Sequence, residues 1–270
     1  MKKVDMHIHT SASDGTWDVE ELKRELVANK IDVFSITDHD SISNVKNMED
    51  IIRPKDNILF IPGVELSSEH EGKEYHLTLY NYDINHKGLL DLIEWTNNNK
   101  LSSNRDYIAS YAANKYEDVS VEDFEKYEFN RKRGGWKSAW YMFDKGIHKN
   151  IPEHLKDVYA SGLKAKLKSP QEVIDIAKKS GGKVFLAHPS YHFREGMPKE
   201  ELKFWLECGI DGIECYSPYN KGASQQYIDF CKKNNLMISG GSDCHGNFIP
   251  SRKLGNPTVS LEDLNIKKLM

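Results

Sequence analysis

Residues 4–10 read VDMHIHT, and the run at 4–8 is expected to form a β-strand. His7 and His9 are two residues apart, so on a strand both rings project to the same face. A buried imidazole without a partner costs free energy, and a metal ion would supply the partner that these two rings need. The stretch therefore predicts a strand whose end carries metal-ligating side chains.

Beyond this strand, short apolar runs alternate with amphipathic stretches. Asp18 and Glu21 have the spacing of a capping box, and Ser169-Pro170 has the pattern of a helix start. Such alternation predicts parallel βαβ units in an α/β domain, either barrel-like or doubly wound. Further strands are expected over residues 33–37, 58–66, 75–82, 184–187, 212–216 and 237–239, and helices over residues 18–27, 45–51, 170–180, 199–208 and 224–233.

The alternation stops between about residues 100 and 165, where the pattern is helical and rich in aromatic and charged side chains. We therefore expect a barrel domain formed by residues 1–99 and 166–270. A helical insertion, here called the cap, is expected over residues 100–165.

Composition excludes several classes of protein. The 270 residues are 39% hydrophobic and 29% charged, which suits a packed core rather than a disordered chain. A net charge of −4 argues against a general polyanion binder. There is neither an apolar run near the roughly 18 residues that span a bilayer nor a signal-peptide core at the N-terminus. The four cysteines share no CxxC spacing, so we expect free thiols and a cytoplasmic location.

Five short segments place ligand-type side chains at the C-terminal ends of predicted strands, where the loops of a parallel barrel converge on one mouth. They are DMHIHT with His7 and His9, ITDHD with His39, PGVEL with Glu65, LAHPS with His188, and SGGSDCH with Asp243 and His245. His76 starts its predicted strand, so it reaches this mouth only if that strand runs antiparallel or bends. Imidazole with carboxylate suits zinc, iron or manganese better than calcium.

Three residues next to these ligands are assigned roles from their position. Asp38 and Asp40 flank His39, and they either orient the ligand imidazoles or cap a helix. Cys244 lies between Asp243 and His245, so on alternating backbone it is expected to point away from the metals and pack.

Together, these motifs resemble those of the PHP (polymerase and histidinol phosphatase) family, in their order and over residues 3 to about 100 and about 170 to 257. The resemblance implies a distorted (β/α)7 TIM-like barrel, the PHP fold, that holds three divalent ions (manganese, zinc or iron) and hydrolyses phosphoesters. Carried over by motif, the first ion would be bound by His7, His9, Glu65 and Asp243, the second by Asp14, His39 and His245, and the third by Glu65, His76 and His188. Asp14 stands where some relatives have histidine, which favours the branch of small phosphatases that act on nucleotides.

The cap and two loops supply candidate substrate contacts. Residues 128–146 read EFNRKRGGWKSAWYMFDKG, in which Arg131 and Arg133 could bind phosphate and Trp136 could stack on a base. The alternative is that Trp136 packs the cap against the barrel. Arg194 and Arg252 are further candidates for a phosphate contact, and His192 and Arg194 are candidate helpers of the leaving group.

We therefore expect a metal-dependent phosphoesterase that uses a metal-activated hydroxide to hydrolyse a phosphomonoester of a small nucleotide. Nucleoside monophosphates and 3′,5′-bisphosphates are the expected substrates, with short oligonucleotides degraded from one end as a related case. Phosphate is the expected product, and neither a membrane nor a stable duplex nucleic acid is an expected partner. The sequence also leaves open histidinol-phosphate phosphatase activity, C–N hydrolysis on an amidohydrolase-like barrel, and a non-catalytic metal-binding scaffold.

Overall fold

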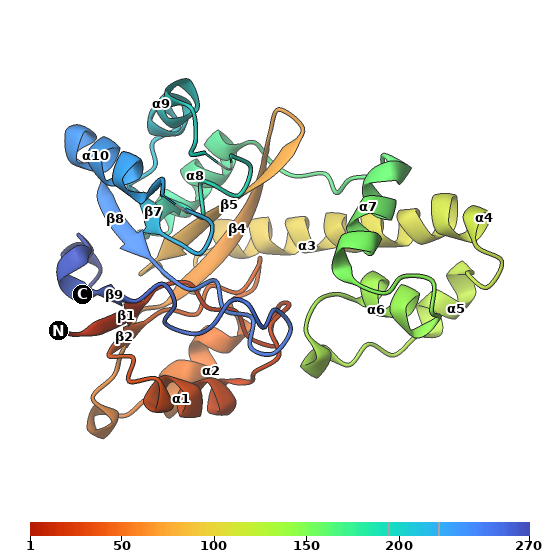
Figure 1. Cartoon of the computed structure of the whole chain (residues 1–270), viewed down its shortest axis with the longest axis horizontal. Helices are drawn as coiled ribbons and strands as arrows, with labels where there is room; N and C mark the ends of the chain where they lie inside the picture. The colour runs from red at the N-terminus through yellow and green to blue at the C-terminus, as the bar shows by residue number, and fades with distance from the viewer. Residues whose placement is uncertain (194, 221) are drawn as a thin grey trace.

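The computed structural model describes residues 1–193, 195–220 and 222–270 and places them in two lobes (Figure 1). The larger lobe contains the β-sheets with helices around them, and the smaller lobe consists of helices from the middle of the chain. The prediction of an α/β fold is therefore confirmed.

The first sheet has the strand order β3-β2-β1-β9. Its strands are β1 (Lys3–Asp5), β2 (Val33–Phe34), β3 (Leu59–Phe60) and β9 (Val259–Ser260). β2 pairs in parallel with both β1 and β3, whereas β9 runs antiparallel to β1.

The second sheet has the order β4-β5-β6-β7-β8. Its strands are β4 (Gly63–His70), β5 (Lys73–Tyr80), β6 (Lys183–Leu186), β7 (Gly212–Tyr216) and β8 (Met237–Gly240). β5 is antiparallel to both of its neighbours, and β6, β7 and β8 are parallel. In the long hairpin of β4 and β5, two strands of opposite direction therefore lie side by side.

Two single bridges, Ile8 with Cys244 and His39 with Glu65, connect the sheets. Within the described residues the hydrogen bonding forms two sheets, and it does not close the (β/α)7 barrel that the resemblance implies. The chain leaves the regular ladder early, after Asp5 in β1, so the predicted strand at 4–8 is too long. The single strand expected over 58–66 is also wrong, because the segment around Pro62 separates β3 from β4, and proline has no N–H to donate.

Helices cover both sheets of the larger lobe. They are α1 (Val19–Ala28), α2 (Ser43–Ile51), α8 (Pro170–Lys179), α9 (Lys199–Glu207) and α10 (Ser224–Asn234). The predicted capping box of α1 is confirmed, since the backbone N–H of Glu21 donates to the Asp18 side chain at 2.8 Å and the Asp18 N–H donates to the Glu21 side chain at 2.9 Å. Ser169 and Glu172 form a second capping box at α8.

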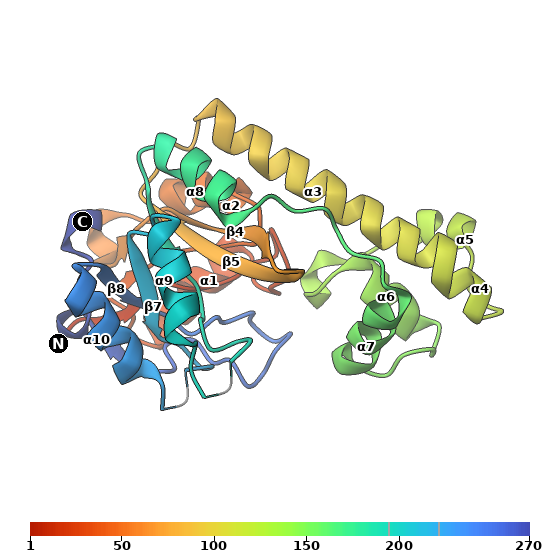
Figure 2. The ribbon, with the colours of Figure 1, turned by 90° about the horizontal axis from the view of Figure 1, so that it is seen from above.

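The smaller lobe begins with the long helix α3 (Lys87–Tyr107), which starts against α8 and extends away from the sheets (Figure 2). The other elements are a π-helical turn (Ile108–Ala112), α4 (Ala113–Lys115), α5 (Val121–Lys126), α6 (Lys137–Asp144) and α7 (Ile151–Ser161). These helices have a core of their own, in which Tyr107, Phe124 and Tyr141 pack together. Short 3₁₀ turns occur at Pro54–Asp56, Arg131–Arg133, Leu261–Asp263 and Lys267–Leu269.

The cysteines behave as their spacing predicts. All four thiols are free and buried. Cys244 packs with Ile8 and Leu254 in the core beside α1 and α2, which is where the alternation of the strand end was expected to place it. None of the helices in the described residues is long and apolar enough to cross a membrane.

Candidate metal centre

His7 and His9 lie just beyond β1 and are fully buried. Their Nε2 atoms are 3.1 Å apart, so the two rings point to one place, as their spacing predicts. Gly241, in the loop after β8, makes room for this arrangement, because a Cβ at that position would lie 2.4 Å from the Cβ of His7. Only a glycine lets the loop pass so close to the backbone and Cβ of His7.

Glu65 on β4 occupies the middle of the cluster and is fully buried. One of its carboxylate oxygens, Oε1, faces two imidazoles, and the other, Oε2, faces three. The distances from Oε1 are 2.9 Å to His188 Nε2 and 3.2 Å to His76 Nδ1, and those from Oε2 are 3.0 Å to His39 Nδ1, 3.2 Å to His7 Nε2 and 3.3 Å to His9 Nε2. A single buried carboxylate is thus surrounded by ring nitrogens.

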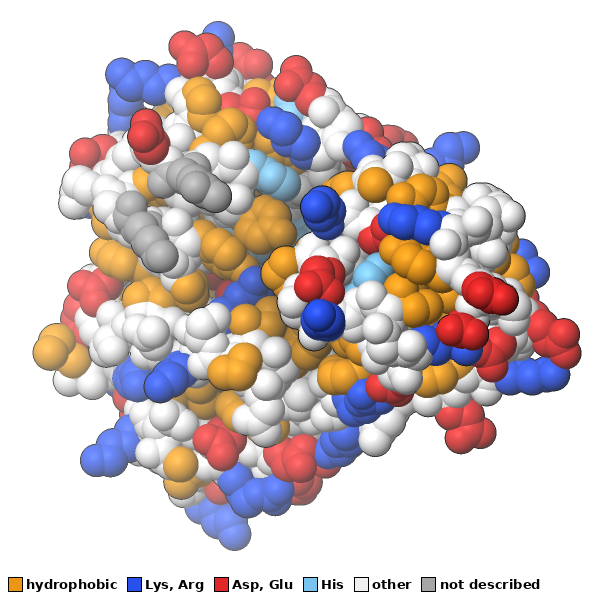
Figure 3. Space-filling model, turned by 45° about the vertical axis from the view of Figure 1, so that its right-hand side comes forward, with side chains coloured by type: hydrophobic (Ala, Val, Ile, Leu, Met, Phe, Trp, Pro, Cys, Tyr) orange, Lys and Arg blue, Asp and Glu red, His pale blue; other side chains and the backbone are white. Residues whose placement is uncertain are grey.

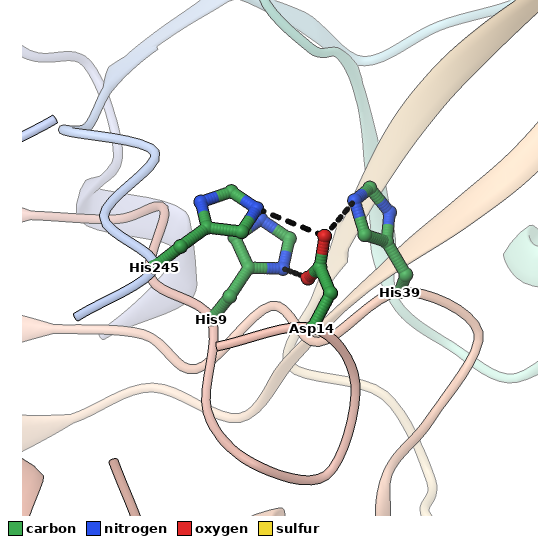
Figure 4. A group of neighbouring side chains, drawn as sticks. All are labelled: His9, Asp14, His39 and His245. Atoms are coloured by element: carbon green, nitrogen blue, oxygen red, sulfur yellow. Dashed lines mark ion pairs between the residues drawn. The ribbon is translucent and has the colours of Figure 1, made fainter. Parts of the chain in front are cut away.

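Asp14 lies on one side of this cluster, in the loop between β1 and α1, and three imidazoles surround it (Figure 4). Its Oδ2 is 3.3 Å from His245 Nε2 and 3.9 Å from His39 Nε2, and its Oδ1 is 3.5 Å from His9 Nδ1. The rings of His9 and His245 stack with their centroids 4.1 Å apart. Three segments distant in the sequence therefore meet at one aspartate.

His76 reaches the cluster because β5 runs antiparallel to β4. The register pairs His76 with Ser67, two residues along β4 from Glu65. The condition set by the sequence, an antiparallel or bent strand, is therefore met. His188 follows β6, which lies on the other side of β5 from β4. Its ring centroid lies 5.3 Å from that of His76.

All nine predicted ligand residues lie in this one region of the molecule. Asp243 completes it, with Oδ1 3.0 Å from His9 Nε2 and 3.5 Å from His7 Nε2. Four overlapping groups have ligand atoms within 4.8 Å of one another: His9, Asp14, His39 and His245; His7, His9 and Asp243; His7, Glu65 and His188; and His39, Glu65 and His76.

The chemistry of these atoms fits divalent cations. Three atoms of the cluster are buried and make no hydrogen bond, namely His9 Nδ1, His39 Nδ1 and Glu65 Oε2. Buried polar atoms are normally paired, and an unpaired one costs about 1–3 kcal/mol. Imidazole nitrogens with carboxylate oxygens are the donor set of zinc, iron and manganese sites, so a cation of this kind would pair the orphaned atoms.

Comparisons with known proteins show what this chain resembles. The PHP domain matches residues 5–133. The 5′-3′ exoribonuclease Rnm of Escherichia coli strain K12 is 28% identical over 255 residues, which cover 89% of this chain and 84% of that protein. Residues 5–133 of this chain form a PHP domain. The PHP chain is accordingly a metal-dependent phosphoesterase, a hydrolase that acts on phosphoester bonds.

Other relatives and solved structures extend the likeness. A 5′-3′ exoribonuclease of Haemophilus influenzae is 26% identical over 255 residues, 90% of each chain. A candidate metal-dependent phosphoesterase of Bifidobacterium adolescentis superposes with a TM-score of 0.83 at 20% identity, over 98% of this chain and 94% of that one. An amidohydrolase of Chromobacterium violaceum superposes with a TM-score of 0.77 at 20% identity, over 96% and 91%. At such identities these two structures show a shared fold alone.

Neighbouring charges and burial shift the pKa values of the cluster in opposite directions. Burial alone would raise the pKa of Glu65, but the surrounding imidazoles, His7 first among them, hold it well below its ordinary value. Burial likewise works against protonated histidines, yet neighbouring carboxylates raise the pKa of His9 to about 9 and that of His76 to about 10. For His39 burial prevails, and its pKa lies well below the usual value. Bound cations would take over the compensation that protons provide here.

The backbone is strained at three positions of the site. Asp40, His188 and Asp243 have φ angles of 43°, 26° and 51°, in the region that favours glycine. Residues other than glycine keep such conformations only where the surrounding structure holds them, and they gather at functional sites.

Glu214 on β7 is a site residue that the sequence reasoning missed. It is fully buried, accepts a hydrogen bond from His7 Nδ1 at 3.0 Å, and accepts one from the backbone N–H of His188 at 2.7 Å. It therefore orients two candidate ligands from behind. The signal in the sequence was an acidic residue inside the apolar run GIECY, where Ile213 and Cys215 face the core.

Asp38 and Asp40 take neither of the two roles predicted for them. Asp38 accepts hydrogen bonds from the backbone and hydroxyl of Thr10, at 2.7 and 2.6 Å, and so fixes the loop that leads to Asp14. Asp40 accepts from Ser67 and from Lys100 Nζ, the latter at 2.9 Å. The N-cap of α2 is Ile42, without a side-chain bond. Both aspartates brace the loops and strands that carry the ligands.

The cap residues that were predicted to contact substrate make contacts with other residues of this chain. Arg133 forms hydrogen bonds of 2.6 and 2.7 Å to Asp144, and its guanidinium lies 3.5 Å from the ring centre of Trp140. Arg131 donates to the backbone oxygen of Ala12 at 3.3 Å. The Trp136 ring lies 6.5 Å from that of Phe248, which agrees with packing between the lobes.

The same segment of the cap holds the loop of Asp14. The backbone N–H of Gly135 donates to the Asp14 carbonyl at 2.7 Å, and Lys132 Nζ lies 2.5 Å from Asp18 and 2.6 Å from Glu21. The segment RKRGG thereby fastens the cap to the start of α1.

The remaining candidates differ in their position. Arg252 lies beside the cluster, where its Nη1 donates to Asp243 Oδ2 at 2.7 Å. His192 donates through Nε2 to the backbone oxygen of Glu74 at 2.7 Å, and burial lowers the pKa of this histidine. Arg194 lies outside the described residues.

Proposed function

We propose that this PHP chain hydrolyses a phosphoester of a nucleotide. The substrate would be a nucleoside monophosphate, a nucleoside 3′,5′-bisphosphate or the end of a short RNA. The observation that carries the proposal is the buried Glu65 carboxylate, which is surrounded by five imidazoles and has an oxygen without a hydrogen-bond partner. That two relatives are 5′-3′ exoribonucleases supports the nucleotide as the substrate class.

We further propose that the cluster holds three divalent ions, manganese, zinc or iron, with Glu65 shared between two of them. The donor groups overlap in a way that accommodates the ligand sets carried over from the family, His7, His9, Glu65 and Asp243; Asp14, His39 and His245; and Glu65, His76 and His188. Cations in such a site neutralise phosphate charge and activate water as a nucleophile.

The chain's own side chains would then bind and position the substrate. Arg252 is one-fifth exposed and lies beside Asp243, so its free N–H groups can reach a phosphate oxygen at the edge of the cluster. The cap, residues 100–165, would act as a separate structural unit that closes one side of the site. Its contacts with the Asp14 carbonyl and with α1 support that role.

The test measures hydrolysis by purified protein with Mn²⁺ and after exhaustive treatment with EDTA. Adenosine 3′,5′-bisphosphate, a 5′-phosphorylated oligoribonucleotide in single-stranded and duplex form, and histidinol phosphate are the substrates, with released phosphate and nucleotide as readouts. We expect Mn²⁺-dependent hydrolysis of the nucleotide substrates, with the duplex resistant. Activity that survives EDTA would refute the metal dependence, and turnover of histidinol phosphate alone would identify a histidinol-phosphate phosphatase instead.

C–N hydrolysis and a non-catalytic scaffold have less support. Metal-dependent C–N hydrolysis often uses a metal-bridging lysine, and the sequence places none at the end of a predicted strand that carries ligands. A non-catalytic scaffold would tolerate lost ligands, yet all nine positions carry side chains that can bind a metal.

A further inference from the structure

Two aromatic side chains are exposed where most others are buried. Tyr159 on α7 is 68% exposed, and Tyr191 in the loop after β6 is 50% exposed. Every other phenylalanine, tyrosine and tryptophan in the described residues is buried or half-buried. One of the two belongs to the cap and the other to the larger lobe.

Tyr191 forms the outer end of an aromatic chain that starts at the metal centre. Its ring lies 5.7 Å from that of the candidate ligand His188 and 5.2 Å from that of Tyr219. The Tyr219 ring is itself 5.4 Å from His188, and the guanidinium of Arg252 lies 4.9 Å from its centre. The exposed ring is thus held next to the residues that would bind the phosphate.

Figure 3 shows histidine side chains in a hollow between the two lobes, with hydrophobic side chains on both sides of it. An exposed aromatic ring gains most from a flat, apolar ligand, and a nucleobase has that shape.

We propose that Tyr191 forms a stacking site for the nucleobase of the substrate whose phosphate lies at the metal centre. This inference rests on the proposed function and specifies how it recognises a nucleotide. Stacking uses the face that every base possesses, so the site would discriminate little between bases. It would require an unpaired base, because a base within a duplex is already stacked on its neighbours.

The experiment compares AMP with ribose 5-phosphate, which has the same phosphate and sugar but lacks a base. The variants are Tyr191→Ala and the conservative Tyr191→Phe, with Val27→Ala as a control at an exposed apolar position on α1. KM and kcat are measured with Mn²⁺ for both esters. Binding of both to EDTA-treated protein is measured by isothermal titration calorimetry, which requires no turnover.

We expect wild-type protein to bind AMP more tightly than ribose 5-phosphate. Tyr191→Ala should raise the KM and the dissociation constant for AMP by about 5- to 100-fold, the usual range for loss of one stacked base. Tyr191→Phe should restore binding to within about twofold of wild type, since phenylalanine keeps the stacking face. The values for ribose 5-phosphate, and those of the Val27→Ala control, should not change.

Two results would overturn the stacking site. One is equal binding of AMP and ribose 5-phosphate by wild-type protein, and the other is an equal loss for both esters in Tyr191→Ala. Failure of the proposed function is distinguishable, since a chain that hydrolyses no phosphoester can still be tested for the difference in binding.

Discussion

Replacement of Glu214 by glutamine tests how the buried surroundings orient the ligand histidines. The carboxylate accepts two hydrogen bonds, one from His7 Nδ1 at 3.0 Å and one from the backbone N–H of His188 at 2.7 Å. A carboxamide of the same shape offers one acceptor oxygen, and its NH₂ group would face the second donor. Glu214→Gln therefore leaves one N–H of the buried pair without an acceptor.

The expected loss of metal affinity follows from this one unpaired N–H group. One unpaired buried donor costs about 1–3 kcal/mol. At about 1.4 kcal/mol per factor of ten, that cost corresponds to roughly 5- to 150-fold, which overlaps the 10–100-fold losses typical of partners behind metal ligands. We expect the Mn²⁺ concentration for half-maximal activity to rise by about 10–100-fold, while kcat at saturating Mn²⁺ changes far less.

The assay is a Mn²⁺ titration of phosphoester hydrolysis, supported by the metal content of the dialysed protein. Glu207→Gln is the matched control, because Glu207 lies on the surface of α9 and pairs with the exposed Lys203. An unchanged Mn²⁺ dependence in a folded Glu214→Gln protein would refute the orienting role. A large loss in the Glu207→Gln control would show that the assay reports general damage.

Three further predictions concern a metal ligand, a buried histidine of the cap, and the contact that Gly135 makes between the two lobes. Asp243→Ala should reduce kcat by at least about 10²-fold in a steady-state assay, because it removes a carboxylate from the cluster, and near-normal turnover would contradict its role. Burial lowers the pKa of His154 to about 4, so the neutral ring is the folded form, and the contribution of this residue to stability should fall as the pH drops below about 6.5 and level off near 4. In denaturant unfolding, the free energy of unfolding of the wild type minus that of His154→Asn should therefore decrease by about 2 kcal/mol from pH 8 to pH 5, and a constant difference would contradict the assignment. Gly135→Ala should lower the unfolding temperature, because φ is +68° there and the new Cβ would lie 2.6 Å from the Phe248 ring. An unchanged unfolding temperature would contradict a close contact between the lobes at Gly135.

Local signals in the sequence predicted local structure well. The capping box at Asp18 and Glu21 needs only residues three apart, and the shared face of His7 and His9 needs only the alternation of an extended chain. The strand ends were less predictable. The ladder stops at Asp5 because pairing is decided by strands from elsewhere in the chain, and an apolar run does not reveal where its partners end.

Non-local contacts decided the parts that the sequence could not show. His76 reaches the cluster through the antiparallel register of β5, which no residue around position 76 specifies. Glu214 belongs to the site because β7 places it behind His7, a contact between positions 207 residues apart. The basic run of the cap was expected to contact phosphate. In the folded chain the guanidinium of Arg133 donates hydrogen bonds to Asp144 and lies over the ring of Trp140, and the sequence did not reveal these contacts.

The most direct test of the metal centre is an anomalous difference map from crystals grown with Mn²⁺. We expect separate peaks among the nine His, Asp and Glu side chains, with Glu65 between two of them. A map without a peak there, or with manganese bound only elsewhere on the surface, would contradict the assignment of this cluster as a metal site.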